Sequence, residues 1–128
     1  MLNRDPEDGK RQMVFAPDLI RVPPGTTLRF LPTDRGHNTA STEGMLPEGT
    51  EPWRSKINDP FDLTLEIEGT YGFHCTPHLS MGMVGLVLVG DATVNFDAAR
   101  AVRQRGRAAE RYEDLFARAE ALLAEDSA

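Results

Sequence analysis

One short stretch of the chain gathers the side chains that could bind a soft metal ion. Residues 71–83 read Tyr-Gly-Phe-His-Cys-Thr-Pro-His-Leu-Ser-Met-Gly-Met and hold the only cysteine, two of the three histidines and two of the five methionines. A thiolate, imidazoles and a weakly bound thioether together favour copper over hard cations and are typical of blue-copper electron-transfer sites. The second imidazole of such a set would come from His37, the histidine outside this stretch.

The order of residues around Cys75 suggests how one loop could supply several ligands. In a strand over 71–75, alternate side chains point to opposite faces, so Cys75 would point inward with the aromatic residues of the strand. Pro77 ends the strand, because its ring fixes its own torsion and restricts the residue before it. We therefore expect the chain to turn back and bring His78 and Met83 to the ion that Cys75 holds.

Length and charge limit the class of protein. A chain of 128 residues is long enough for one domain with a core that needs no disulfide, and a single cysteine excludes an intramolecular one. The net charge of -6 argues against nonspecific binding to nucleic acid or to a membrane surface. The sequence shows no apolar run long enough to span a membrane and no leader of the secretory type. We expect a soluble monomer.

The first two thirds of the sequence have the pattern of a β protein. Runs rich in β-branched and aromatic residues, bounded by Pro, Gly or Asp, predict strands. They occur at 13–15, 17–22, 26–31, 60–67 and 83–89. In the run at 60–67, the residues expected on the buried face are Phe61, Leu63, Leu65 and Ile67. The segments 4–12 and 38–59 predict irregular loops, the second with Met45, Leu46 and Trp53 packed inward.

The character of the sequence changes after Gly90. Alanine, arginine and glutamate dominate, and apolar residues at helical spacing predict helices over 95–105 and 107–124, with their arginines on a solvated face. Strands followed by a helical tail favour a mainly β fold, a Greek-key β-sandwich with two C-terminal α-helices. We expect residues 1–92 to form the sandwich with the copper site, and 93–128 to form a helical extension packed on the same single domain.

Three motifs give the chain a resemblance to a known group of proteins. Cys-Thr-Pro-His-x-x-Met-Gly-Met at 75–83, Pro-Thr-Asp-x-Gly-His-Asn at 32–38, and Gly-Met-x-Pro-x-Gly through Ser-Lys-Ile-Asn at 44–58 resemble the pseudoazurins, periplasmic blue-copper cupredoxins. The resemblance runs from Met1 to about Leu123 and implies a cupredoxin sandwich. The residues that match the copper ligands of that family are His37, Cys75, His78 and Met83, and Asn38 would tie the two ligand loops together.

The same resemblance implies a function. It predicts a periplasmic one-electron carrier, not an enzyme, that cycles copper between Cu(II) and Cu(I). It would pass electrons to copper nitrite reductase or a related respiratory partner, and a c-type cytochrome is a second candidate partner. The partner would dock at the copper end, near His78, Met81, Arg35, Arg54 and Lys56. The lysines of the family's docking face are mostly replaced here, with Arg4 and His74 at two further matching positions, and the charged segment 5–12 departs from the family pattern.

Other interpretations of the same residues stay open. Cys75 followed by His78 and then Met81 is also a blue-copper spacing, of the amicyanin type, although the Met-Gly-Met pair favours Met83 as the axial ligand. Zinc accepts the same nitrogen and sulfur ligands, so a copper or zinc storage module is the main alternative. A cysteine-dependent enzyme would need an orienting group and a substrate cleft, and the sequence supplies no feature that indicates either.

Overall fold

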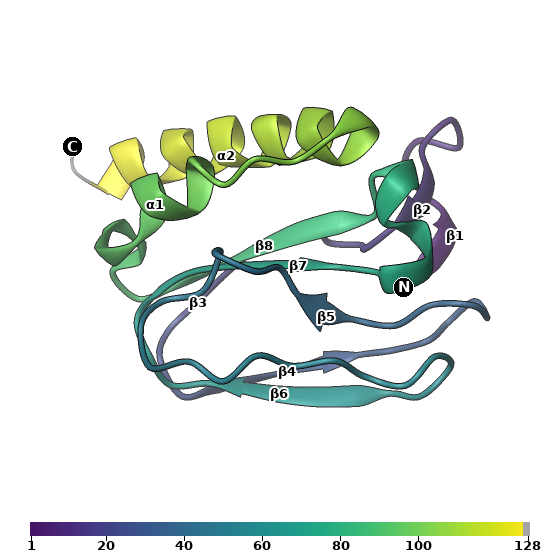
Figure 1. The fold of residues 1–128 in the computed structure, drawn as a ribbon, viewed down its shortest axis with the longest axis horizontal. Helices are drawn as coiled ribbons and strands as arrows, with labels where there is room; N and C mark the ends of the chain where they lie inside the picture. Colours follow the sequence, from purple (N-terminus) through teal and green to yellow (C-terminus); the bar gives the residue numbers. More distant parts are fainter. Residues whose placement is uncertain (127–128) are drawn as a thin grey trace.

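The computed structural model describes residues 1–126, which fold into short strands followed by helices (Figure 1). The strands are β1 (Leu2–Arg4), β2 (Gln12–Val14), β3 (Leu19–Val22), β4 (Thr26–Phe30), β5 (Ala40–Ser41), β6 (Phe61–Leu65), β7 (Gly69–His74) and β8 (Val84–Val89). The helices are the 3-10 helices η1 (Thr76–Met81) and η2 (Ala92–Val94) and the α-helices α1 (Phe96–Arg100) and α2 (Gly106–Asp126).

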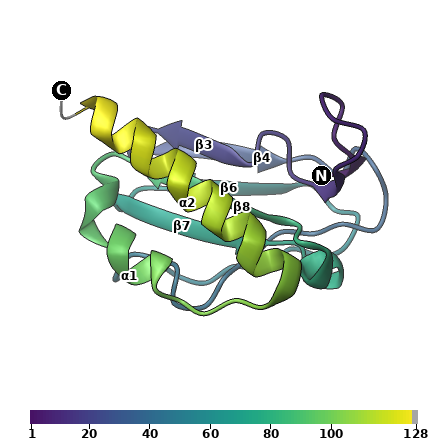
Figure 2. The same ribbon diagram turned by 90° about the horizontal axis from the view of Figure 1, so that it is seen from above.

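The elements form three layers. The central layer is a four-stranded sheet in the order β3-β8-β7-β5, in which β3 runs parallel to β8 while β7 is antiparallel to both β8 and β5. The antiparallel pair β4 and β6 lies against one face of this sheet, and α1 and α2 cover the other face (Figures 1 and 2). The mainly β sandwich with C-terminal helices predicted from the sequence is therefore confirmed.

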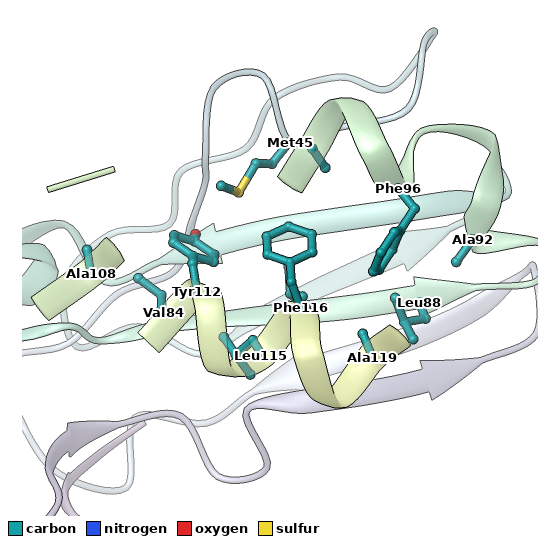
Figure 3. Close-up of a cluster of buried hydrophobic side chains, with 12 residues drawn as sticks. Met45, Val84, Leu88, Ala92, Phe96, Ala108, Tyr112, Leu115, Phe116 and Ala119 are labelled. Atoms are coloured by element: carbon teal, nitrogen blue, oxygen red, sulfur yellow. The ribbon is translucent and has the colours of Figure 1, made fainter. Parts of the chain in front are cut away.

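Strand β8 is buried on both faces and so contributes to two cores. Val84, Leu86 and Leu88 point toward α1 and α2, into the helix-side core shown in Figure 3. Val87 and Val89 point the other way, into the sandwich core between the two sheets, which also contains Cys75 and Met83. A strand buried on both faces reads as a continuous apolar run, as residues 84–89 do.

The predicted strands hold in position to within two residues, but β1 and β5 were not predicted, and the burial of one residue was wrong. Leu65 is 2% exposed, as expected for the inner face of β6, but Ile67 is 38% exposed. The reason is that β6 ends at Leu65 and β7 begins at Gly69, so Ile67 lies in the turn between them and not on the face of a strand. The segment 38–59 is irregular apart from the short strand β5, and within it Met45 and Trp53 are buried as predicted.

The helical tail also differs from the expectation in two respects. The first helix is only Phe96–Arg100 and not 95–105. Just before it, Asn95 binds the main chain of Thr70, and just after it, Val102 packs against the helix-side core. The arginines of the tail do not all lie on a solvated face, since Arg111 is half-buried and hydrogen-bonded to main-chain carbonyls. Among residues 1–126, no helix has both the length and the apolar character that crossing a bilayer requires.

The different burial of Leu65 and Ile67 predicts different effects of their substitution on stability. Leu65→Ala is expected to lower the free energy of unfolding by about 2–5 kcal/mol, because it opens a cavity in the sandwich core. Ile67→Ala removes a similar side chain from an exposed turn and should change stability by less than about 0.5 kcal/mol. Urea denaturation of the metal-free variants would measure both, and equal losses would contradict the burial described above.

Candidate metal centre

The four predicted ligands lie at one end of the sandwich, where β7 passes into β8. Cys75 follows the end of β7, His78 lies in η1 and Met83 immediately precedes β8. His37 reaches the same place from the loop that follows β4. Cys75, His37 and Met83 are fully buried, while His78 is half-buried. The structure thus brings together residues that are separated by almost forty positions in the sequence.

The donor atoms converge. Cys75 Sγ lies 3.7 Å from His37 Nδ1 and 3.4 Å from His78 Nδ1. The three donor atoms all lie within 4.8 Å of one another. A metal–sulfur bond of about 2.3 Å and a metal–nitrogen bond of about 2.0 Å at a roughly tetrahedral angle separate the two donors by about 3.5 Å. The side chains therefore fit a single ion held between the thiolate and two imidazoles.

Met83 is held next to Cys75 by the main chain. The Cys75 N–H donates to the Met83 carbonyl at 2.9 Å, and the Met83 N–H donates to the His78 carbonyl at 3.2 Å. Met83 also belongs to the same core cluster as Cys75, whereas Met81 lies in η1 and is half-buried. Burial beside the thiol favours Met83 over Met81 as the thioether ligand.

The ring of His37 is oriented by a residue from the N-terminal strand. His37 Nε2 lies 2.7 Å from Asn3 Oδ1 in β1. An amide oxygen only accepts hydrogen bonds, so Nε2 carries the proton and the lone pair of Nδ1 faces Cys75. Second partners of this kind fix the tautomer and direction of metal-binding imidazoles. No role for Asn3 could be predicted from the sequence, because its contact partner lies 34 residues away.

Burial sets the protonation of the metal-free site. It raises the pKa of the Cys75 thiol, and the main-chain N–H groups of Asn38 and His78, which hydrogen-bond to the sulfur, oppose that effect. Burial also lowers the pKa of His37, and the neighbouring His78 lowers it further. At neutral pH the thiol is therefore protonated and His37 is neutral, so metal binding must displace the thiol proton.

Asn38 joins the two loops that carry the candidate ligands, as the resemblance implied. Its Oδ1 accepts from the Thr76 N–H at 2.7 Å, and its Nδ2 donates to Thr76 Oγ1 at 3.1 Å and to the Ser55 carbonyl at 3.3 Å. Asn38 is 1% exposed, so these bonds are shielded from water. The loop containing His37 is thereby fixed to the first residue of η1.

The stretch between Cys75 and Met83 forms two short 3-10 turns that meet at a kink at His78, where φ is -118° and ψ is 17°. Pro77 occupies its start, where a missing N–H costs nothing, and the His78 N–H donates to the Cys75 carbonyl at 3.1 Å. The helix ends at Gly82, whose φ of 83° is left-handed and suits glycine. The Gly82 N–H donates to the Leu79 carbonyl at 2.9 Å. The backbone between the candidate ligands is therefore fixed at both ends.

Exposed basic residues occur in the segments that meet beside His78. Gly36, with a φ of 94°, lies beside the His78 ring, and its N–H donates to Asn58 Oδ1 at 2.6 Å. Arg35 and Lys56, both exposed, lie one and two residues from Gly36 and Asn58 in the sequence. Pro77, which is exposed, and Leu79, which is half-buried, flank His78 in the sequence and provide apolar surface there.

His74 differs from its expected place on the surface. Its ring is half-buried, with Nδ1 2.8 Å from Thr42 Oγ1, which in turn lies 2.7 Å from the Tyr112 hydroxyl of α2. Burial lowers the pKa of His74, and the nearby Arg54 lowers it further, so the imidazole is neutral at neutral pH. His74 therefore adds no charge to the basic surface predicted around the site.

Comparisons with known proteins agree with this geometry. Residues 4–90 match the family described as copper binding proteins of the plastocyanin/azurin family. The chain is 49% identical over 111 residues to the pseudoazurin of Paracoccus pantotrophus, a match that covers 87% of this chain and 74% of that one. It is 42% identical over 117 residues to the pseudoazurin of Methylorubrum extorquens, covering 91% and 77% of the two chains.

Solved structures agree as well. The fold matches pseudoazurin from Methylobacterium extorquens AM1 with a TM-score of 0.86 at 42% identity, covering 92% of this chain and 94% of that one. The pseudoazurin of Hyphomicrobium denitrificans matches with a TM-score of 0.85 at 36% identity, covering 92% and 93%. The chain therefore belongs to the plastocyanin/azurin family of copper-binding proteins and, within it, to the pseudoazurins, which carry electrons on copper and are not enzymes.

Proposed function

We propose that His37, Cys75, His78 and Met83 bind a single type 1 copper ion, and that the protein carries electrons in the periplasm to copper nitrite reductase or a c-type cytochrome. The convergence of Cys75 Sγ with the Nδ1 atoms of His37 and His78, all within 4.8 Å, is the observation that carries this proposal. The periplasm and the two partners are proposed from the resemblance to pseudoazurins. Bound copper would supply a one-electron couple at this site.

The contribution of the protein is a binding site that keeps its shape. Cu(II) and Cu(I) favour different ligand arrangements, so a site that cannot rearrange keeps the energy of reorganisation small. The hydrogen bonds of Asn38, Asn3 and the Cys75–Met83 main chain limit such movement. Met83 as a weak axial ligand and the N–H groups that face the Cys75 sulfur would tune the reduction potential.

Electrons would enter and leave through the imidazole of His78. It is the half-buried member of the ligand set, while His37, Cys75 and Met83 are sealed inside the protein. The apolar surface of Pro77 and Leu79 next to it would let a partner approach closely. On an acidic chain with a net charge of -6, the basic residues Arg35, Arg54 and Lys56 would orient a partner that carries an acidic patch.

The helical tail belongs, in this proposal, to the same domain as the copper site. Residues 1–92 would form the cupredoxin sandwich, and residues 93–126 an extension packed on it; the last two residues of the predicted extension, 127 and 128, lie outside the described part of the chain. The support is the helix-side core, in which Tyr112, Leu115 and Phe116 of α2 pack against Leu86 and Leu88 of β8 (Figure 3). A sheet face of this kind, apolar along β8, needs a cover to exclude water.

Copper loading tests the ligand set directly. The oxidised protein should show the intense visible thiolate-to-copper absorption and the narrow copper hyperfine splitting of a type 1 site, and Cys75→Ser should abolish the visible band. Absorption and electron paramagnetic resonance spectra would measure both. A colourless protein after loading with Cu(II), in which the metal is still bound, would favour a storage module and contradict the proposal.

A matched pair of variants distinguishes the two methionines. Met83→Leu should keep copper bound while raising the midpoint potential, because loss of the axial thioether removes a donor that favours Cu(II). Met81→Leu should leave the potential and the spectrum unchanged, since Met81 would only contribute to the rim. Voltammetry of the two copper-loaded variants gives the comparison. A shift in Met81→Leu alone would assign the axial position to Met81.

Charge reversal tests the docking surface. Arg35→Glu should lower the association rate constant with copper nitrite reductase by about tenfold at low ionic strength, and the loss should shrink as salt is added. Arg100→Glu is the matched control, because it makes the same charge change in α1, at the opposite end of the molecule from η1 (Figure 1). Stopped-flow kinetics would follow both, and equal effects would place the docking surface elsewhere.

A further inference from the structure

One arginine of α2 makes contacts unlike those of its neighbours. Arg111 Nη1 donates to the Gly82 carbonyl at 3.2 Å and to the Met13 carbonyl at 3.3 Å, and Nη2 donates to the Gln12 carbonyl at 3.3 Å. Arg118, also on α2, instead pairs with the carboxylates of Asp18 and Asp114. The half-buried guanidinium of Arg111 thus connects α2 to main-chain groups of two separate segments.

The first of these segments is the backbone immediately before Met83. Gly82 is buried, and a side-chain carbon at this position would lie 3.1 Å from the Arg107 carbonyl and 3.1 Å from Arg111 Cδ. The helix therefore touches the chain at the point where η1 ends and Met83 begins. Because Met83 is 0% exposed and follows directly, the direction of the Gly82 carbonyl helps to define where Met83 begins.

The next residue of α2 reaches the other side of the ligand-bearing stretch. The Tyr112 hydroxyl donates to the Phe73 carbonyl at 2.9 Å, two residues before Cys75, and accepts a hydrogen bond from Thr42. Burial raises the pKa of Tyr112, so this hydroxyl stays protonated and remains a donor. Two consecutive residues of one helix thus bind the main chain before Cys75 and before Met83.

We propose that Arg111 is a positioning residue for the copper site, which acts through its hydrogen bond to Gly82 to hold Met83 at a fixed place relative to Cys75. Its planar fork can bind two carbonyls at once, which a flexible ammonium group does less well. The second carbonyl, that of Met13 in β2, ties this part of the site to the N-terminal hairpin of β1 and β2. This inference rests on the proposed assignment of Met83 as a copper ligand.

The test compares Arg111→Gln with Arg111→Lys and with Arg118→Gln as a matched control. Arg118→Gln also removes a guanidinium from α2. The hydrogen bonds that it removes are those to Asp114 and Asp18, which lie outside the stretch from Cys75 to Met83. In the metal-free protein, amide hydrogen exchange at Cys75 and Met83 should become about tenfold faster in Arg111→Gln, because local opening of this stretch becomes easier. The control should leave exchange at both amides unchanged.

The copper-loaded variants give the second readout. Arg111→Gln should shift the midpoint potential and the ratio of the visible thiolate-to-copper bands, Arg111→Lys should recover part of each shift, and Arg118→Gln should match the parent protein. The proposal is overturned if Arg111→Gln lowers only the free energy of unfolding, or if Arg118→Gln shifts the same quantities equally. Failure of the copper assignment would look different, because the parent protein itself would then lack the type 1 spectrum.

Discussion

The antiparallel pairing of β7 with β8 is the constraint on which the site depends. Gly69–His74 pairs with Val84–Val89, and the hydrogen bond from the Cys75 N–H to the Met83 carbonyl continues that ladder by one more step. Because β8 is buried on both faces, it cannot shift without exposing two cores at once. The ends of the ligand-bearing stretch are therefore fixed by the most buried part of the molecule.

Around the pair of strands β7 and β8, hydrogen bonds from polar side chains limit the movement of the loops. Asn38 holds the loop of His37 to η1, and Asn3 holds the imidazole of His37 in one tautomer. Asn38 is buried, so leaving its amide unpaired would cost more than it would at the surface, whereas Asn3 is itself exposed and its Oδ1 reaches the buried ring of His37. The same burial raises the pKa of the Cys75 thiol and makes the site one that binds metal in exchange for a proton.

The C-terminal helix does more than cover the sheet. Its apolar face closes the helix-side core, while Arg111 and Tyr112 reach the backbone on either side of Cys75 and Met83. By contrast, Glu120 of α2 forms an exposed ion pair with Arg100 of α1. Exposed pairs of this sort contribute little to stability, so the buried contacts distinguish the role of the helix.

The sequence by itself determined the donor atoms, their order along the chain and the face of β7 that carries Cys75, because side-chain chemistry and the two-residue period of a strand are local properties. The predicted burial of Ile67 was wrong, because the alternating pattern does not show where β6 ends, and Ile67 lies in the turn beyond that end. Only the tertiary structure determined that Asn3 contacts His37 and that Arg111 contacts Gly82. Each meets its target across at least 29 residues, and no local pattern encodes contacts that exist only after distant segments have packed together.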